Sequence, residues 1–341
     1  MVSVPTHIKF KMKILVIGGV AAGMSCAARA RRLDENATIV VLEKSGYVSF
    51  ANCGLPYHIG QEIKDREALL LHTPESLQSL LNIEVRVKHE AIEIIRKDKK
   101  VRIRRLEDNT EYEDTYDKLV LCPGAHPVKP QISGIDNPRI FVLRGIEDMD
   151  KINLAIEKFS PKNCLIAGAG YIGIEMAENL HARGIKVEIA AKYSHTMPVF
   201  DPEMTVDFED HMVSNGITLH YNSAVQGFFE ETDRIVAELG NSRNIESDIV
   251  IFCVGVRPDV HLAKNSGLKI GELGGISVDK HLLTSDPDIY AAGDAIEVFD
   301  FVSKEPALIP LAGPANRQGR IVADNIFGRN SVYDSSLGTA I

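Results

Sequence analysis

Residues 13–23 read KILVIGGVAAG, and this stretch decides the fold. Residues 14–17 are continuously apolar, as expected for a parallel strand buried on both faces. Glycines at 18, 19 and 23 open a helix rich in Ala and Arg, and a second apolar run at 39–42 ends in Glu43, 20 residues beyond Gly23. This order is typical of a dinucleotide-binding unit, in which helix N-terminal amides receive the pyrophosphate and the acid receives the ribose hydroxyls.

A second unit of the same kind lies about 150 residues further on. Residues 164–167 are apolar, residues 168–173 read GAGYIG, and a helix to about Arg183 and a strand at 186–190 follow. This turn matches the full G-x-G-x-x-G pattern, whereas Val20 replaces the middle glycine of the first turn. Either turn alone could be an ordinary strand-to-helix glycine turn. Two together predict two dinucleotides, which is typical of a flavin that takes electrons from a nicotinamide.

The end of the second unit's strand bears on the choice of nicotinamide cofactor. Residues 190–192 read Ala-Ala-Lys, with no acid at the ribose position. A carboxylate there favours NADH and repels a 2′-phosphate, so its absence beside Lys192 permits NADPH. The alternative is that Lys192 is a solvated surface lysine. We therefore expect FAD together with NADH or NADPH.

Composition limits the remaining function classes. The 341 residues suffice for two domains or slightly more, and 38 Lys and Arg against 47 Asp and Glu give a net charge of −9. That sign argues against a nucleic-acid or anionic-membrane binder, and no apolar run approaches the ~20 residues of a membrane span. Five cysteines are too few for a disulfide scaffold and suit a reducing cytosol. We expect a cytoplasmic protein with no nucleic-acid partner, no membrane span and no metal site.

Loop markers predict how the chain divides. CPGA at 122–125 follows an apolar strand, and a second apolar strand runs into GVRP at 255–258, so the chain crosses between domains at these points. We expect an α/β protein with two Rossmann-like domains, each a three-layer ββα arrangement, the second inserted in the first. After residues 1–11, a dispensable arm or a misassigned start, the expected parts are 12–121 for FAD, 122–249 for NAD(P) with its core at 160–247, and 250–330 for FAD again. Residues 289–295 read as a strand whose Gly-Asp turn leads to a helix.

Cys53 differs from the other cysteines. Cys26 falls in the first helix and Cys122, Cys164 and Cys253 lie in or beside apolar strands, as buried small hydrophobes would. Cys53 lies in the loop SFANCGLPY at 49–57, just after Glu43, which places it near the ring end of a flavin. No second cysteine lies two to five residues away, so a reactive Cys53 must form a mixed disulfide with a small thiol, a persulfide or a sulfenate. The alternative is a packed loop cysteine.

The loop at 49–57 resembles the active-site signature of the coenzyme A disulfide reductases, in the single-cysteine branch of the FAD-dependent pyridine nucleotide-disulfide oxidoreductases. The resemblance covers nearly the whole chain and includes GAGYIGIEMAE at 168–178, VGVRPD at 254–259, YAAGDA at 290–295 and PLAGPANRQGR at 310–320. It implies reduction of coenzyme A disulfide, or of coenzyme A persulfide or polysulfide, with Cys53 as the catalytic nucleophile. It also implies a homodimer whose C-terminal interface domain begins at 331–341 and is otherwise missing from this chain.

The resemblance also implies the site residues. Asp294 would contact the ribityl or pyrophosphate region of FAD, Tyr171 would cover the flavin until the nicotinamide displaces it, and Glu175 would lie near the nicotinamide. The full set expected to bind cofactors is Gly18, Gly19, Val20, Ala21, Ala22, Gly23, Glu43, Lys44, Pro123, Gly124, Gly168, Gly170, Tyr171, Ile172, Gly173, Glu175, Lys192, Gly293 and Asp294. The substrate would contact Ser25, Arg29, Arg32, Ser49 and Asn52.

Three alternatives remain open at this point. Arg29 and Arg32 share one helix face and suit the phosphates of coenzyme A, but they could instead pair with Asp34 or Glu35. NADH oxidases and peroxidases of the same branch usually carry a histidine at the position of Ala21, which cannot exchange protons. A function of another class is a non-catalytic FAD subunit that senses redox state or delivers electrons.

Overall fold

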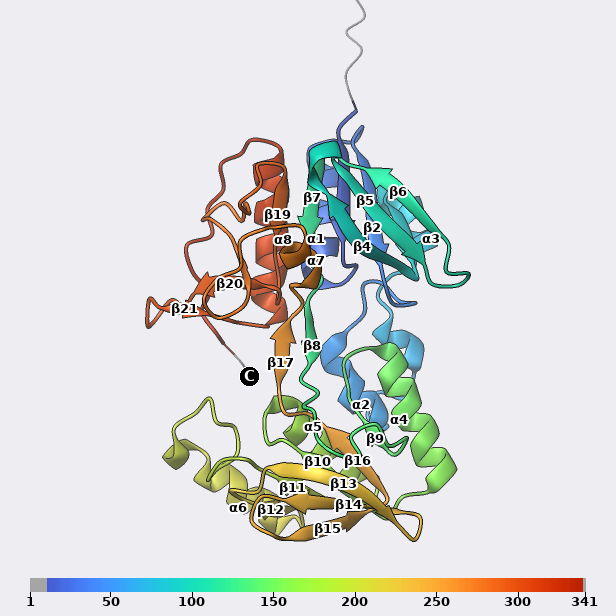
Figure 1. Ribbon diagram of the computed structural model, residues 1–341, viewed down its shortest axis with the longest axis vertical. Coiled ribbons are helices and arrows are strands. Elements are labelled where there is room, and N and C mark those ends of the chain that lie inside the picture. The colour runs from blue at the N-terminus through green and yellow to red at the C-terminus, as the bar shows by residue number, and fades with distance from the viewer. Residues whose placement is uncertain (1–10, 340–341) are drawn as a thin grey trace, which may run out of the picture. The chain divides into compact units, whose positions relative to one another are not determined.

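The computed structural model describes residues 11–339, so the N-terminal arm expected at 1–11 lies almost entirely outside the described residues. The chain forms two units. Unit 1 takes the described residues up to Phe50, then His72–Ala125, then those from Pro258 onward. Unit 2 takes Ala51–Leu71 and His126–Arg257. Where the chain passes between the units, the short strands β8 (Ala125–Pro127) and β17 (Val256–Pro258) pair with each other (Figure 1).

Unit 1 is built on a five-stranded parallel sheet. Its central strand, β1 (Lys13–Ile17), pairs with β2 on one side and β7 on the other, and residues 14–16 are fully buried. That burial on both faces explains why the strand is a continuous apolar run. The strand order is β19 (Ile289–Ala291), β7 (Lys118–Leu121), β1, β2 (Thr38–Glu43) and β3 (Glu84–Val87).

Helices α1 (Ala21–Leu33) and α8 (Ala312–Ile326) lie side by side in unit 1 (Figure 1). Gly319 permits their close approach, because a Cβ at this position would lie 2.1 Å from the carbonyl oxygen of Ala22. The smaller elements of unit 1 are α3 (Pro74–Leu81), α7 (His261–Asn265), the 3₁₀ turn η3 (Arg96–Asp98), and two three-stranded sheets. These sheets are β4 (His89–Ile95), β5 (Lys100–Arg105) and β6 (Glu111–Thr115), and β18 (Ile276–Ser277), β20 (Ile296–Phe299) and β21 (Pro306–Ala307).

The segment after Gly293 differs from expectation. The helix predicted there is wrong, because strand β20 begins at Ile296. Ile296 and Val298 are buried while Phe299 is exposed, so the segment alternates with the two-residue period of a strand.

Unit 2 repeats the plan of unit 1 with a second five-stranded parallel sheet. Its central strand β10 (Asn163–Ala167) pairs with β11 (Lys186–Ala190) and β16 (Ile249–Phe252), and β12 (Thr218–His220) and β9 (Ile140–Phe141) form the edges. The antiparallel strands β13 (Val225–Glu231), β14 (Arg234–Leu239) and β15 (Asn244–Ser247) share an apolar core with this sheet. The helices are α4 (Ile146–Phe159), α5 (Tyr171–Ala182) and α6 (Val206–Ser214), with the turn η4 (Pro202–Met204).

The segment that carries Cys53 also belongs to unit 2. It contains η1 (Asn52–Gly54), α2 (Leu55–Ile59) and η2 (Arg66–Leu69), and α2 packs on α4 and α5. Gly60 fits closely against Asn179 of α5, since a Cβ at 60 would lie 2.0 Å from Asn179 Oδ1. Arg183 Nη1 donates to the carbonyl oxygen of Ile59 at 3.0 Å and so satisfies the end of α2.

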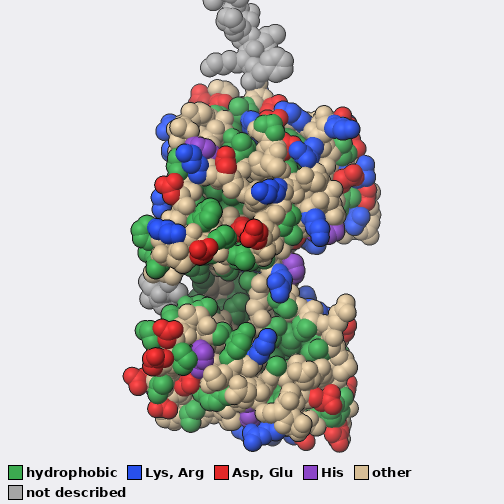
Figure 2. Space-filling model, turned by 60° about the vertical axis from the view of Figure 1, so that its left-hand side comes forward, with side chains coloured by type: hydrophobic (Ala, Val, Ile, Leu, Met, Phe, Trp, Pro, Cys, Tyr) green, Lys and Arg blue, Asp and Glu red, His purple; other side chains and the backbone are tan. Residues whose placement is uncertain are grey.

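The predicted fold class is therefore confirmed: two Rossmann-like units, with most of the second inserted in the first. Throughout residues 11–339, no helix combines the length and the apolar character that crossing a bilayer requires. On the face shown in Figure 2, Lys and Arg side chains are interspersed with Asp and Glu and form no broad patch of one sign.

Candidate active site

The first glycine turn in unit 1 depends on its glycines. Gly18 has φ 103°, and a Cβ there would lie 2.0 Å from the carbonyl oxygen of Cys122. A Cβ on Gly23 would lie 1.9 Å from the carbonyl oxygen of Gly18. Any side chain at Gly18 or Gly23 would therefore disrupt the turn.

The N-terminus of α1 presents amides rather than side chains. Its N-cap, Val20, provides no capping hydrogen bond, and its first turn has no acidic residue. By contrast, α3 is capped by Thr73 and carries an acid in its first turn. The uncapped amides and the positive end of the helix dipole suit a diphosphate.

Glu43 stands at the end of β2 beside this turn. It is 9% exposed, and its Oε2 accepts from the Gly19 N–H at 2.7 Å while Oε1 accepts from the Ser45 N–H at 2.8 Å. A carboxylate has about four acceptor positions, so both oxygens keep capacity for ribose hydroxyls. The neighbouring Lys44 forms an ion pair with Glu90 at 2.6 Å. The residues at this turn therefore fit FAD.

Two further glycines border the same sheet edge. Gly124 has φ 76° and follows β7, and Gly293 has φ 84° and follows β19. A Cβ on Gly293 would lie 3.1 Å from the Ala22 Cβ, so Gly293 lies next to the start of α1. The Gly293 N–H donates to Gln318 Oε1 at 2.7 Å, and Asp294 follows directly. The structure thus gathers most of the residues predicted for FAD at the carboxyl edge of one parallel sheet.

The second glycine turn, in unit 2, has the same geometry. Gly168 has φ 117°, and a Cβ there would lie 2.2 Å from the carbonyl oxygen of Cys253, while a Cβ on Gly173 would lie 2.2 Å from that of Gly168. A Cβ on Gly170 would meet nothing within 4 Å. As the N-cap of α5, Gly170 leaves the helix amides facing open space, and the first turn carries no acid. This arrangement fits the diphosphate of a pyridine nucleotide.

Two predicted nucleotide contacts lie on α5. Tyr171 is 41% exposed and packs edge-on against Phe200, with ring centroids 6.4 Å apart. Glu175 follows one turn later, and burial together with the charge of Glu178 raises the pKa of its carboxyl. Ala190 and Ala191 at the end of β11 are buried.

Lys192 is exposed beyond this strand, its Nζ 5.4 Å from the centre of the Tyr193 ring. Residues 190–195 read AAKYSH, so the loop contains no carboxylate. This feature leaves the 2′-position of a bound nucleotide without a repelling charge from this loop.

Cys53 is exposed at the start of the segment that packs on α5. Tyr57 lies one turn later, and the pKa of its hydroxyl is raised by burial and then by the nearby charges of Glu175, Glu178 and Cys53. Unit 2 therefore brings together Cys53, Tyr57 and Glu175. Next to the thiol, Asn52 has a buried Oδ1 that accepts no hydrogen bond from any described residue.

The residues predicted for substrate fall in both units. Ser49 belongs to unit 1, adopts φ 50°, and donates its N–H to the Gly19 carbonyl oxygen at 2.8 Å. Ser25 Oγ donates to Asn316 Oδ1 at 2.7 Å, and Arg29 pairs with Asp324 at 2.8 Å. Arg32 is exposed, and no ion pair to it is found among residues 11–339. The carboxylates of Asp34 and Glu35 pair with neither Arg29 nor Arg32.

Arg31 has a structural role instead. Its guanidinium donates to the carbonyl oxygens of Leu81 and Asn82 at the end of α3, and to those of Asp34 and Glu35 beyond α1. Sequence reasoning assigned no role to Asn316, Gln318 or Asp324. Asn316 and Gln318 lie in the motif at 310–320, and that motif is the sequence signal that could have identified them.

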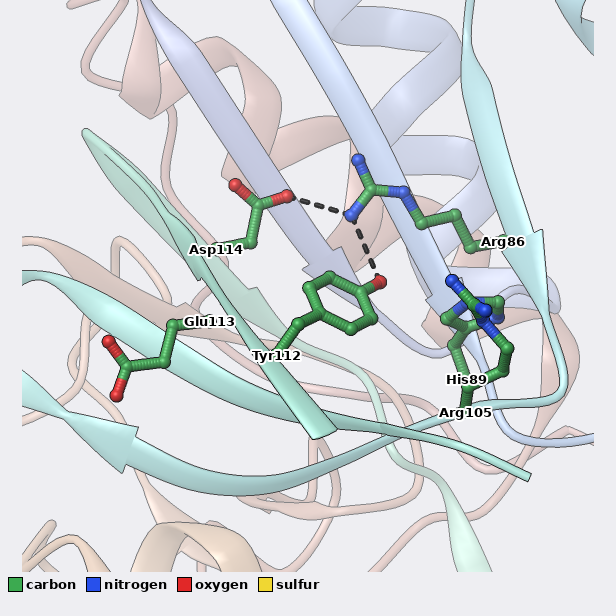
Figure 3. Close-up of a pocket in the computed structure, with 6 residues that line it drawn as sticks. All are labelled: Arg86, His89, Arg105, Tyr112, Glu113 and Asp114. Atoms are coloured by element: carbon green, nitrogen blue, oxygen red, sulfur yellow. Dashed lines mark hydrogen bonds and ion pairs between the residues drawn. The ribbon is translucent and has the colours of Figure 1, made fainter. Parts of the chain in front are cut away.

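A separate pocket in unit 1 contains none of the predicted site residues (Figure 3). Arg86 is one of its lining residues and donates to Tyr112 Oη at 3.1 Å and to Asp114 Oδ2 at 2.8 Å. A third partner, Glu84, lies 2.7 Å from Arg86 Nε. Because its guanidinium is paired on three sides, Arg86 joins β3 to β6 rather than offering a charge to a ligand.

Comparison with known proteins agrees with this geometry. Residues 12–319 match the family described as pyridine nucleotide-disulphide oxidoreductase. A coenzyme A disulfide reductase of Staphylococcus haemolyticus is 35% identical over 330 residues, covering 96% of this chain and 73% of that protein. An NADH oxidase of Methanocaldococcus jannaschii is 34% identical over 331 residues, covering 97% of this chain and 73% of that protein.

Two solved structures are also similar. Reduced Bacillus anthracis CoADR-RHD has a TM-score of 0.94 and 42% identity, and the match covers 97% of this chain and 59% of that chain. An NAD-dependent persulfide reductase from A. fulgidus has a TM-score of 0.93 and 35% identity, and the match covers 96% of this chain and 62% of that chain. The chain thus spans about three fifths of the length of these two solved chains.

The chain belongs to the pyridine nucleotide-disulphide oxidoreductase family. This membership confirms the predicted family and places the chain among FAD-dependent oxidoreductases that use NADH or NADPH. The homodimer, the cytoplasmic location and the absence of a nucleic-acid partner stay predictions.

Proposed function

We propose that this protein reduces coenzyme A disulfide, or coenzyme A persulfide or polysulfide, with electrons from NADH or NADPH, and that Cys53 is its redox-active thiol. The observation that carries the proposal is the exposure of Cys53 in the same unit as the Gly168–Gly173 turn. Burial raises the pKa of the Cys26 and Cys253 thiols to about 12, and it also raises the pKa of Cys122 and Cys164. Those four thiols stay protonated and unreactive, which leaves Cys53 as the nucleophile.

The proposed chemistry at Cys53 is thiol–disulfide exchange. The Cys53 thiolate attacks one sulfur of coenzyme A disulfide, forming a mixed disulfide and releasing one coenzyme A thiolate. Two electrons then cleave the mixed disulfide, releasing the second coenzyme A and restoring the Cys53 thiolate. FAD held at the first glycine turn would supply those electrons from the nicotinamide.

The surrounding residues hold the reactants and control protons. Glu43 and the amides of α1 would bind FAD, and the amides of α5 would bind the dinucleotide diphosphate. The raised pKa of Tyr57 keeps its hydroxyl protonated, so Tyr57 can donate a hydrogen bond near the thiol. Asn52 precedes Cys53 in the chain and would lie beside the pantetheine part of the substrate.

NADH oxidase activity is the second candidate, because the relative from M. jannaschii carries that name. Ala21 argues against a peroxidase, since a methyl group in the first turn cannot transfer protons. A flavin subunit that only delivers electrons would keep nicotinamide oxidation but would not need Cys53.

The test compares two variants of the full chain loaded with FAD. Cys53→Ser should retain FAD and its anaerobic reduction by NADPH, yet lose consumption of coenzyme A disulfide. Cys164→Ala is the matched control, because it removes a buried thiol from β10 of the same unit. Unchanged disulfide turnover in Cys53→Ser would refute the proposal, and oxygen-dependent NADH consumption as the sole activity would favour the oxidase.

A further inference from the structure

Six side chains form a seam along α1 and α8 in unit 1: Ser25, Arg29 and Arg32 from α1, and Asn316, Arg320 and Asp324 from α8. Two contacts align the helices. Ser25 Oγ donates to Asn316 Oδ1 at 2.7 Å, and one helical turn later Arg29 Nε donates to Asp324 Oδ1 at 2.9 Å. Asn316, Arg320 and Asp324 are spaced by four residues and share a face, so Arg320 lies between the two contacts.

The seam carries excess positive charge. Arg29 pairs with Asp324, and Arg329 Nε lies 4.0 Å from the same carboxylate oxygen. Arg32 and Arg320 are exposed, and neither forms a hydrogen bond or ion pair through its side chain with another described residue. Two guanidiniums therefore share one carboxylate, and those of Arg32 and Arg320 have no charged partner among residues 11–339, on a protein whose net charge is −9. Such a local excess suits an anion with more than one charge.

The backbone beneath the seam is held tightly. The close contact at Gly319 fixes the spacing of α1 and α8, because a Cβ there would also lie 3.0 Å from the Cys26 amide nitrogen. Asp324 further accepts from Ser331 Oγ at 3.3 Å, which helps to fix the carboxylate that orients Arg29. Guanidiniums on such a frame start from fixed backbone positions, and each can present paired donors to phosphate oxygens.

We infer that Arg320 binds a phosphate group of an organic ligand, together with Arg29 and Arg32, and that Asp324 is a positioning residue for Arg29. The inference rests on the proposed function for the source of the phosphate, because coenzyme A carries a 3′-phosphate and a diphosphate. Arg320 adds a contact from α8, some 290 residues along the chain from the arginines of α1.

Binding of adenosine 3′,5′-bisphosphate to the full chain tests the inference by calorimetry. Arg320→Ala should weaken binding about tenfold, the usual effect of losing one charge-assisted hydrogen bond, and Arg320→Lys should restore part of it. The matched control is Arg317→Ala, an exposed arginine of the same helix whose guanidinium lies 5.6 Å from the centre of the Tyr333 ring. That control changes net charge equally and should change affinity less than twofold.

Turnover supplies a second measurement. Arg320→Ala should raise KM for coenzyme A disulfide about tenfold at unchanged kcat, and leave KM unchanged for pantethine, a disulfide without phosphate. Equal effects of Arg320→Ala and Arg317→Ala on bisphosphate affinity would refute the inference. A protein that binds inorganic pyrophosphate but not adenosine 3′,5′-bisphosphate would refute it as well. Bisphosphate binding needs neither Cys53 nor turnover, so a chain that binds it but reduces no disulfide would refute the proposed function instead.

Discussion

Two glycines of the second turn should respond in opposite ways to the same added methyl group. Gly170→Ala places a Cβ in open space, with no protein atom within 4 Å and φ at −91°, so the fold should tolerate it. Gly173→Ala places a Cβ 2.2 Å from the Gly168 carbonyl oxygen and 3.2 Å from Cys253 Sγ, so helix and strand must separate. The space open to the first methyl group is where we place the nucleotide diphosphate.

The expected magnitudes follow from these contacts. Gly170→Ala should keep or slightly raise the melting temperature. Alanine lowers the conformational entropy of the unfolded chain, which raises the free energy of unfolding by about 0.4–1 kcal/mol. It should weaken NADPH binding about tenfold, or ~1.4 kcal/mol, by displacing the diphosphate from the α5 amides. Gly173→Ala should cost about 1–3 kcal/mol of folding stability, as overpacking against backbone usually does.

The assay is anaerobic stopped-flow reduction of the bound FAD by NADPH, with thermal unfolding followed in parallel. Gly170→Ala should show a higher NADPH concentration at half-maximal rate and unchanged FAD content. If Gly170→Ala bound NADPH as tightly as the unmodified chain, the second turn would not be the nucleotide site and the reasoning would fail.

Three more predictions concern other parts of the molecule. Lys192→Glu should lower the ratio of kcat/KM for NADPH to kcat/KM for NADH at least tenfold, because a carboxylate in that loop repels a 2′-phosphate. Steady-state kinetics with both nucleotides measures this ratio, and an unchanged ratio would exclude Lys192 from the nucleotide site. Gly60→Ala should displace α2 from Asn179, lower the melting temperature and change the alkylation rate of Cys53, whereas an unchanged rate would show that α2 does not position the thiol. Burial opposes ionisation of Asp114, but Lys13 and Arg86 pair with it and hold its pKa below the ordinary value. Its contribution is therefore present at neutral pH, begins to be lost as pH falls below about 4, and is fully lost only below the lowered pKa of the folded state. Asp114→Asn should thus cost about 1–3 kcal/mol near pH 7 and progressively less as pH falls below about 4; a cost that does not change with pH would contradict the ion pair.

The two glycine turns were predictable because their signals are local. Each joins an apolar strand to a helix within about a dozen residues, and the required backbone angles exclude other residue types at Gly18 and Gly168. The apolar runs likewise predicted the central strands β1 and β10, because burial on both faces leaves no place for polar side chains.

The missed features depend on partners distant in the chain. Arg29 pairs with Asp324, and nothing near Arg29 in the sequence indicates which helix will face it. The packing of the Cys53 segment on α5 depends on the fit of Gly60 against Asn179. The strand at β20 was mistaken for a helix because its four residues are too few for apolar periodicity to distinguish the two.

Mapping the adduct formed with coenzyme A disulfide tests the single-thiol claim most directly. The oxidant is added to the pre-reduced, desalted protein without nicotinamide, and peptide mass spectrometry locates the mixed disulfide while a thiol assay counts released coenzyme A. The account predicts one coenzyme A released per chain and one adduct, on the peptide that contains Cys53. An adduct on Cys26, Cys122, Cys164 or Cys253, or no adduct in protein that still consumes the disulfide with NADPH, would contradict it.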